Sequence, residues 1–582
     1  EPAEAVKQYD AILAEAQNGP YRASIQYQAA ELLLSMGNTS GAYGRLQGIV
    51  TDYPDTYSAY QAIALLDQAN WKLDTLLRGQ IYYYNEDWTA AIQEFNAYTS
   101  QTGEATIDML LMLGRAYRAA GNPQAAVTTF QTVLDYYPTD PAFGDAWLEQ
   151  GRTYFLSGDT MAAIQRYTEL ATLHPDVAQG AEALWRAGYL YSTLGDTANA
   201  LATFDTLGEM YPGTEWAQEG LMLGATLAYS SGNTGQATQL FSRLAETGYG
   251  ENQAAAYLWV GRLYQSEGKD DLARQAYQQA AAADPGGYFS LRADDLLNGR
   301  APFQAPAGAS FTFDEAADLS EAETWLRTTF GITQEGALYP LSEQLQADPR
   351  LIRGQELMSV AAYDEAEAEF ETLRQAYSDD ALATYQLAIY FRDQGLYRLS
   401  ITAAADLITK AGINTTQAPG LIARLRYPAY YADLVLPHTE EYGLDPLLIF
   451  SLIRQESLFE GLATSYAAAQ GLMQIIPDTG QWIAAQLDWP DYQNSDVYRP
   501  YVNVAFGTYY LSWVLQQVDN LPYVALAGYN GGPGNAAQWL DISGPDIDLF
   551  IQTIGYDETQ TYVRRIYEQY SVYRELYGTS SG

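Results

Sequence analysis

Cysteine is absent from the chain, and histidine occurs only twice, as His174 and His438. Without cysteine there are no disulfides and no thiol nucleophiles. Two histidines leave too few of the nitrogen and sulfur ligands that zinc sites use. We therefore expect no metal site and no cofactor. A cysteine-free chain is compatible with a life outside the cytoplasm, but composition alone does not require it.

Basic residues are scarce. The 582 residues include 30 Lys and Arg against 71 Asp and Glu, which gives a formal net charge of −41. Such a surface repels the phosphates of nucleic acids and anionic membrane surfaces, so no nucleic-acid partner is expected. A saline habitat and a need for solubility both remain open as origins of the acidity.

Long apolar runs are missing too. No stretch approaches the 18 or more apolar residues of a membrane-spanning helix, so we expect no transmembrane segment. The first residues, EPAEAVKQYDAIL, show neither the basic nor the apolar region of an export signal. The sequence therefore predicts a chain that is either cytoplasmic or already processed.

The chain has the length and the aromatic content to bury large cores. Tyrosine alone occurs 49 times, and 13% of the residues are aromatic. Because 582 residues exceed what one hydrophobic core normally organises, several domains or a repeat array are expected.

A repeat of 36 or 37 residues runs through the first half of the chain. Three features mark it: a small landmark, a turn glycine, and an alanine followed four positions later by an aromatic residue. The landmarks are Gly114, Gly151, Gly188, Gly224 and Gly261, and the turn glycines are Gly121, Gly158, Gly195, Gly232 and Gly268. The pairs are Ala126/Phe130, Ala163/Tyr167, Ala200/Phe204, Ala237/Phe241 and Ala273/Tyr277, with degenerate copies at Ala91/Phe95 and Ala366/Phe370. Each unit is predicted to be a helix, a glycine turn and a second helix.

The stretch LGRAYRAAGNPQAAVTTF resembles the tetratricopeptide consensus. A small residue lets the two helices approach, and the Ala and aromatic residue share one face. One such unit cannot bury its apolar face alone, so the units must stack into an α-superhelix.

Two breaks divide the chain. Residues 299–320 crowd Pro, Gly and Ala together, and residues 411–420 interrupt a second helical stretch. We predict an all-α protein: a tetratricopeptide-like superhelix over 1–298, a linker with further helical repeats over 299–420, and a separate helical domain over 421–582.

In the last domain, the helix predicted from GLDPLLIFSLIRQES ends on a carboxylate. Asp445 and Pro446 are typical of a helix start. Glu456 falls on the same face as the apolar positions of this helix. A carboxyl on an apolar face has a raised pKa, as a general acid requires. The alternative is a helix-end glutamate that pairs with Arg454 or bonds to backbone.

Four short blocks in this domain follow one another in a fixed order: Glu456-Ser457, Gly471-Leu472-Met473-Gln474, Gly528-Tyr529-Asn530, and Glu558-Thr559-Gln560-Thr561-Tyr562-Val563. They resemble the signatures of the soluble lytic transglycosylases, a lysozyme-like family acting on peptidoglycan. LRYPAYYADLV (425–435) and YFSLRADDLL (288–297) also resemble segments of the larger members, which carry an α-superhelix before the catalytic domain.

The resemblance implies a role for individual residues. Glu456 stands at the catalytic glutamate, Ser465 and Gln474 at positions that contact sugar, and Tyr529 and Asn530 in the tyrosine motif next to the catalytic carboxyl. Glu558 and Tyr562 stand in the late motif that lines the cleft. Structural alternatives stay open for three of them: Tyr562 as a core aromatic, Asn530 as a loop brace, and Ser465 as a plain helix start.

The sequence departs from the family pattern at a few positions. Ile476 stands where many relatives have Met, Gly528 replaces the usual Ala, and Glu460-Gly461 replace the frequent Asn-Pro. Glu460 lies only four residues after Glu456, so the two carboxyls would not flank a glycosidic bond as a glycosidase pair does. We expect Glu460 to be solvated.

The resemblance implies cleavage of the β-1,4 bond between N-acetylmuramic acid and N-acetylglucosamine. Glu456 would act first as acid and then as base, and the product would be a 1,6-anhydro sugar. The expected partners are peptidoglycan strands, with a protein held by the repeats as a further candidate, and the expected location is extracytoplasmic. The alternatives are a non-catalytic glycan-binding scaffold and a lysozyme-like hydrolase.

Overall fold

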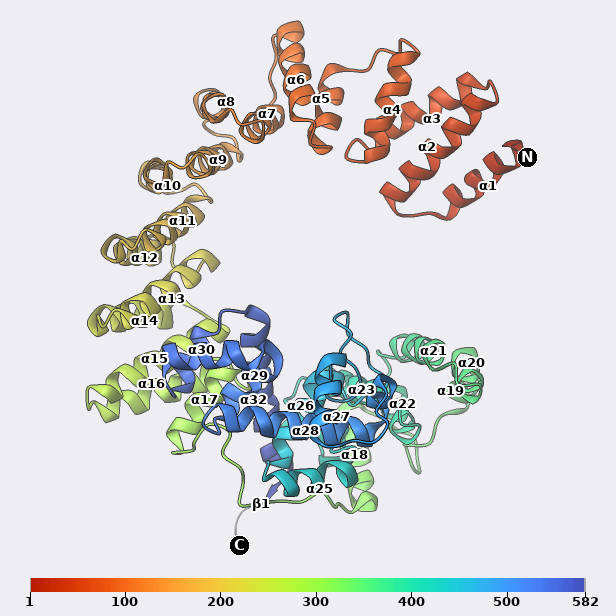
Figure 1. Cartoon of the computed structure of the whole chain (residues 1–582), viewed down its shortest axis with the longest axis vertical. Helices are drawn as coiled ribbons and strands as arrows, with labels where there is room; N and C mark the ends of the chain where they lie inside the picture. The colour runs from red at the N-terminus through yellow and green to blue at the C-terminus, as the bar shows by residue number, and fades with distance from the viewer. Residues whose placement is uncertain (1, 580–582) are drawn as a thin grey trace. The chain divides into compact units, whose positions relative to one another are not determined.

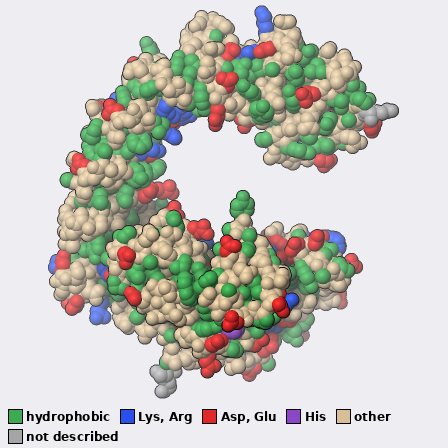
Figure 2. Space-filling view, viewed as in Figure 1, with side chains coloured by type: hydrophobic (Ala, Val, Ile, Leu, Met, Phe, Trp, Pro, Cys, Tyr) green, Lys and Arg blue, Asp and Glu red, His purple; other side chains and the backbone are tan. Residues whose placement is uncertain are grey.

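The computed structural model describes residues 2–579, and nearly all of its regular structure is helical (Figure 1). This confirms the prediction of an all-α protein. The chain divides into two compact units, one ending at Ala273 and the other beginning at Arg274. On the visible face of the molecule, acidic side chains are scattered over the surface and outnumber the basic ones (Figure 2).

The first unit is built from consecutive antiparallel helices. They are α1 (Pro2–Glu15), α2 (Gly19–Ser35), α3 (Thr39–Asp52), α4 (Tyr57–Gln68), α5 (Thr75–Tyr84), α6 (Trp88–Thr102), α7 (Ile107–Ala119), α8 (Pro123–Tyr136), α9 (Phe143–Leu156), α10 (Thr160–Leu173), α11 (Gly180–Thr193), α12 (Thr197–Met210), α13 (Glu215–Ser230), α14 (Thr234–Thr247) and α15 (Gly250–Ser266). Helix α16 (Asp270–Ala283) crosses the boundary between the units.

Close approach of paired helices depends on the landmark glycines. A Cβ on Gly114 would lie 2.4 Å from the ring of Phe130, and one on Gly151 would lie 2.3 Å from the ring of Tyr167. Gly354 meets Phe370 in the same way, at 2.5 Å, in the degenerate copy of the second unit. The aromatic ring therefore occupies the space that a side chain on the first helix would need.

The turns of the repeat combine a glycine with a capping residue. Gly121, Gly158, Gly195, Gly232 and Gly268 all have positive φ, between 73° and 90°. After the first four of these glycines, the next residue is an Asn or Asp that caps the following helix: Asn122 accepts a hydrogen bond from the amide of Ala125 at 3.1 Å, and Asp159 from that of Ala162 at 3.0 Å. These side chains satisfy backbone donors that the first helical turn leaves open.

The second unit contains the remaining elements. Its helices are α17 (Tyr288–Leu297), α18 (Glu315–Phe330), α19 (Glu343–Gln346), α20 (Pro349–Ser359), α21 (Tyr363–Ala376), α22 (Ala381–Asp393), α23 (Tyr397–Ala411), η1 (Thr415–Gln417), α24 (Gly420–Arg426), α25 (Ala432–Tyr442), α26 (Pro446–Ser457), α27 (Pro477–Gln486), η2 (Asn494–Tyr498), α28 (Pro500–Gln517), α29 (Pro522–Gly531), α30 (Pro533–Ser543), α31 (Ile547–Thr553) and α32 (Asp557–Tyr577). Strands β1 (Gly308–Ala309) and β2 (Gly578–Thr579) pair antiparallel.

Helix α26 is buried all round rather than on one stripe. Every residue from Leu447 to Ile453 is at most 5% exposed, because α26 packs against both α25 and α32. Asp445 caps it as predicted, accepting from the amide of Leu447 at 2.9 Å, and also accepts from the hydroxyl of Tyr570 on α32 at 2.5 Å. The helix is thereby fixed at its start as well as along its length.

Segments before the predicted boundary at residue 420 also hold α32. Asp295 of α17 is fully buried. Its carboxylate accepts hydrogen bonds from Arg300 at 2.6 Å, from Arg574 at 2.9 Å and from the hydroxyl of Tyr567. Phe303 packs edge-on against Tyr567 at 4.9 Å. A buried carboxylate needs such partners, so residues 288–303 are part of the structural support of the last helix. The predicted domain boundaries stay predictions.

Among the described residues, no helix combines the length and the apolar content required to cross a membrane.

The packing of the repeat predicts opposite effects for two glycine-to-alanine changes. Gly151→Ala should lower the free energy of unfolding by about 1–3 kcal/mol, because the new methyl group overlaps the ring of Tyr167. Gly44→Ala, inside α3 with open space around it, should raise it by about 0.5–1 kcal/mol through helix propensity. Urea unfolding of the full chain followed by circular dichroism measures both. A shift in the same direction for the two variants would contradict this account of the landmark glycines.

Candidate active site

Glu456 occupies the last turn of α26 and meets a tyrosine from α32. The hydroxyl of Tyr562 donates a hydrogen bond to Glu456 Oε1, and Tyr562 is itself only 5% exposed. The two residues are far apart in sequence, and the packing of α26 on α32 brings them together. A carboxyl is thus held in a defined direction by one neutral donor.

The environment of Glu456 favours its protonated form. The pKa of Glu456 is raised to about 7: burial is the main cause, the hydrogen bond from Tyr562 opposes the rise, and the negative charge of Glu558 adds to it. Burial acts in this direction because it removes water from the charged form. Glu456 can therefore donate a proton near neutral pH.

Tyr529 of α29 is a second tyrosine close to the carboxyl of Glu456. Its hydroxyl donates to the backbone oxygen of Met473 at 2.8 Å, and its ring tilts against Tyr510 at 5.3 Å. Burial, and next the charge of Glu456, raise the pKa of Tyr529 well above its ordinary value. This tyrosine remains neutral, and it connects α29 to the loop that carries Gln474.

The loop between α26 and α27 is held by side chains as well as by backbone bonds. Ser457 donates to the backbone oxygen of Leu472 at 2.8 Å. Gln474 has a φ of 49°, and its side-chain amide donates to Gly471 at 2.8 Å and to Ala463 at 3.3 Å. Both amide protons of Gln474 are thus engaged, and its side-chain oxygen is the group that remains for a ligand.

The remaining predicted residues lie at the periphery. Ser465 is exposed, and its hydroxyl accepts from the amide of Ala469 at 3.0 Å. Asn530 is exposed, and its side chain accepts a hydrogen bond from the hydroxyl of Thr559 at 2.6 Å. This contact agrees with the alternative in which Asn530 braces its loop. Glu558 is exposed at the start of α32. The carboxyl of Glu456 interacts electrostatically with Glu558, Tyr529 and Tyr562. Ser465 and Asn530 instead form hydrogen bonds within the flanking loops.

The structure excludes one alternative for Glu456 and changes one expectation about a neighbouring residue. Arg454 does not pair with Glu456: its Nε donates to the backbone oxygen of Arg426 at 3.1 Å, and its guanidinium covers the ring of Tyr427 at 4.0 Å. The expectation of a solvated Glu460 is wrong. Its side chain is 31% exposed and forms an ion pair with Arg398 at 3.1 Å, because the helical repeat at residues 343–411 packs against this turn.

The sequence analysis missed Asn503, which organises the loop from α28. This residue is fully buried. Its side chain accepts from the amide of Met473 at 2.7 Å and donates to the backbone oxygens of Gln470 at 2.8 Å and Val497 at 2.7 Å. A lone Asn among apolar residues in YVNVAFG was the available signal, since a buried amide must be hydrogen-bonded.

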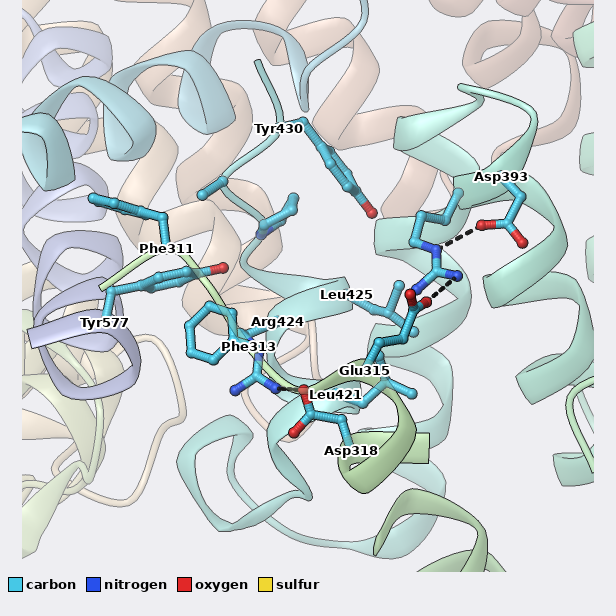
Figure 3. Close-up of a pocket in the computed structure, with 13 residues that line it drawn as sticks. Phe311, Phe313, Glu315, Asp318, Asp393, Leu421, Arg424, Leu425, Tyr430 and Tyr577 are labelled. Atoms are coloured by element: carbon cyan, nitrogen blue, oxygen red, sulfur yellow. Dashed lines mark hydrogen bonds and ion pairs between the residues drawn. The ribbon is translucent and has the colours of Figure 1, made fainter. Parts of the chain in front are cut away.

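A pocket elsewhere in the second unit contains none of the predicted site residues. It has a volume of 460 Å³ and lies between the segment after β1, α22, α24 and Tyr577 (Figure 3). Its charged side chains pair with one another: Arg424 with Asp318 at 2.5 Å, and Arg392 with Glu315 at 3.0 Å and Asp393 at 2.8 Å. Because each of these charged side chains is already engaged in an ion pair, we assign no chemistry to this pocket.

Comparison with known families supports both halves of the architecture. Residues 433–546 match the family described as Transglycosylase SLT domain. Residues 111–178 and 222–288 match one tetratricopeptide family, and residues 25–56 and 182–214 match another.

Individual proteins give the same picture. The soluble lytic murein transglycosylase of Salmonella typhimurium is 31% identical over 243 residues, which cover 41% of this chain and 36% of that protein. The Escherichia coli K12 protein of the same name is 30% identical over 239 residues, covering 40% and 35%. The chain thus spans about a third of the length of these curated relatives.

A solved structure shows the similarity of fold over a longer range. The structure of an inactive glutamate-to-glutamine mutant of lytic transglycosylase Slt from Pseudomonas aeruginosa superposes with a TM-score of 0.52. It covers 98% of this chain and 96% of that chain at 18% identity, a level at which the likeness concerns the fold alone. The chain therefore carries tetratricopeptide repeats followed by a transglycosylase SLT domain, and it is homologous to the soluble lytic murein transglycosylases.

Proposed function

We propose that this protein is a peptidoglycan lytic transglycosylase that cleaves the β-1,4 bond between N-acetylmuramic acid and N-acetylglucosamine. The observation that carries the proposal is the Glu456 carboxyl: it ends a buried helix of an SLT domain, has a pKa of about 7, and receives a hydrogen bond from Tyr562. The relatives named as soluble lytic murein transglycosylases support the same substrate class.

In the first step Glu456 acts as a general acid. Its carboxyl donates a proton to the glycosidic oxygen, the C1–O bond of the muramyl residue breaks, and N-acetylglucosamine leaves as an alcohol. The carbonyl oxygen of the substrate's own N-acetyl group stabilises the positive charge at C1, so no second carboxylate is required. Burial favours this step because it keeps the carboxyl protonated near neutral pH.

In the second step the same carboxyl acts as a base. The ionised Glu456 accepts the proton of the muramyl C6 hydroxyl, whose oxygen forms a bond with C1 and closes the 1,6-anhydro ring. No water is consumed, and the carboxyl returns to its starting state. The hydroxyl of Tyr562 stabilises the intermediate carboxylate, since a hydrogen bond to the charged form favours it.

The flanking residues are assigned to substrate binding. The free side-chain oxygen of Gln474 is placed to accept a hydrogen bond from a sugar hydroxyl or from the N–H of an acetamido group, while its amide protons hold the loop. Ser465 and Asn530 would contact sugars from their exposed positions. Tyr529 would shape the wall of the site through its bond to Met473.

For the repeats we propose a role in access. Residues 1–298 would select the glycan strands that reach the site, or hold a protein partner, in the periplasm or cell envelope. The segment 421–582 alone is not a suitable test of this role, because residues 288–303 supply buried contacts to α32.

Two other functions predict different products. A lysozyme-like hydrolase would place water where the C6 hydroxyl attacks, and a glycan-binding scaffold would release nothing. Glu460 does not serve as a second catalytic carboxylate, since it is engaged by Arg398. Mass spectrometry of muropeptides separates the three: anhydro ends for the transglycosylase, reducing ends for the hydrolase, and no fragments for the scaffold.

Glu456→Gln should abolish at least nine-tenths of the release of anhydro fragments from purified peptidoglycan, because an amide cannot transfer the catalytic proton. A tenfold loss corresponds to about 1.4 kcal/mol in the barrier, so a true catalytic acid should exceed it. The variant should remain folded. The raised pKa means that wild type loses stability as the pH rises from about 4.5 through about 7, and the glutamine variant should lack this loss. More than a tenth of wild-type activity would assign the acid to another residue.

The rate should fall as the pH rises through about 7, because Glu456 must start protonated. Two variants should move this alkaline limb in opposite directions. Tyr562→Phe removes a hydrogen bond that lowers the pKa of Glu456, so the limb moves to higher pH; Glu558→Gln removes a negative charge that raises it, so the limb moves to lower pH. The measurement is a pH–rate profile on peptidoglycan for the three proteins. A limb at the same pH in all three would contradict the assignment of Glu456 as the proton donor.

A further inference from the structure

The backbone directly after the catalytic helix is strained. Helix α26 ends at Ser457, and the next two residues, Leu458 and Phe459, have φ angles of 50° and 65°. Side chains with a Cβ rarely adopt this left-handed region, and such strain persists only where the surroundings hold it. The turn begins two residues after Glu456, so whatever holds it also fixes the end of the helix that carries the carboxyl.

A row of contacting aromatic rings, the aromatic column, packs against the turn. Phe459 is 1% exposed, and its ring meets Tyr430 edge-on at 5.7 Å and Phe450 of α26 at 6.5 Å. Tyr430, drawn in Figure 3, stacks in turn on Tyr397 at 3.9 Å. Tyr397 is the first residue of α23. The column therefore connects α23 of the helical repeat to the catalytic helix.

An ionic contact holds the same turn from the adjacent position of α23. Arg398 Nε lies 3.1 Å from Glu460 Oε2 in an ion pair. Nε, at 2.7 Å, and a second nitrogen of the same guanidinium also donate hydrogen bonds to Glu367 of α21. Burial, and next the charge of Glu367, raise the pKa of Glu460 to about 7. Two carboxyls on one guanidinium form a network in which Arg398 is the central cation.

We propose that Tyr397 and Arg398 are positioning residues for the reaction: Tyr397 holds Phe459 through Tyr430, Arg398 holds Glu460, and this clamp fixes the direction of the Glu456 carboxyl and its shielding from water. The proposal rests on the proposed function for its catalytic consequence, although the clamp itself is a physical contact. The proposal also assigns a function to the helical repeat at residues 343–411, which is to hold the backbone next to the active site in place. Glu460 replaces an Asn of the family pattern, so the ionic half of the clamp is a feature of this chain.

The variant that tests the clamp is Arg398→Met, which keeps much of the length of the side chain and removes its charge. The matched control is Arg353→Met. It breaks a comparable ion pair in the same repeat, Arg353 with Glu369 at 2.7 Å, which does not involve the turn. Arg398→Lys retains the charge and should restore part of any effect.

The first readout is independent of activity. In the turn, the amide of Leu458 donates to Arg454 at 3.1 Å and that of Glu460 to Ser457 at 3.1 Å. Hydrogen–deuterium exchange of the full chain, followed by mass spectrometry, should show faster exchange in the peptide covering residues 454–462 for Arg398→Met, by about tenfold. Arg353→Met should leave this peptide unchanged. Equal exchange in the two variants would overturn the clamp.

The second readout is kinetic. Arg398→Met should lower kcat on peptidoglycan by about fivefold or more, because a small misplacement of a catalytic group is costly, with KM changed less than about twofold. The looser turn should also admit water to Glu456 and move the alkaline limb of the pH–rate profile to lower pH. Tyr397→Phe keeps the stacked ring and should behave as wild type, whereas Tyr397→Ala should resemble Arg398→Met.

The outcomes separate the two proposals. If wild type releases no glycan fragments, the proposed function fails, and the exchange experiment still decides the clamp. If Arg398→Met exchanges faster at the turn but retains the kcat and pH profile of wild type, the clamp is structural only and the positioning role is overturned. A loss of kcat that matches a loss of folded protein, seen as a lower melting temperature without a shift of the alkaline limb, overturns it too.

Discussion

The packing of α26 against α32 is the constraint on which the site depends. It buries the helix that ends in Glu456 and brings Tyr562 to within hydrogen-bonding distance of the carboxyl. Burial and the hydrogen bond act on the pKa of Glu456 in opposite directions, and burial prevails. The result is one carboxyl whose protonated form is favoured and which has a donor ready for its charged form, as the proposed role as acid and then base requires.

Helix α32 in turn depends on residues far from it in sequence. Asp295 of α17 binds Arg574, Arg300 and Tyr567 in a fully buried network, and Tyr570 reaches the cap of α26 through Asp445. Helix α32, which contributes Tyr562, is therefore anchored both to the segment before the linker and to the start of α26. This arrangement explains why the region around residues 288–303 accompanies the site in the same compact unit.

The helical repeat at residues 343–411 supports the site from the other side. Arg398 contacts the strained turn after Glu456 directly, and Tyr397 reaches it through Tyr430. Both supports act on backbone that carries or borders the carboxyl, and neither touches substrate in the proposed mechanism. The site thus consists of a few reactive groups on helices whose positions are fixed by more distant polar and aromatic contacts.

The sequence by itself determined the helical class, the repeat with its landmark and turn glycines, the capped start of α26, and the position of Glu456. These features are local: they depend on spacing along one helix or on the φ of one glycine. Only the tertiary structure decided what surrounds Glu456. The burial of α26 on all sides, the role of Asn503, and the ion pair of Glu460 with Arg398 arise between segments distant in the chain. No periodicity within a segment encodes such contacts, because they depend on which faces of separate helices meet.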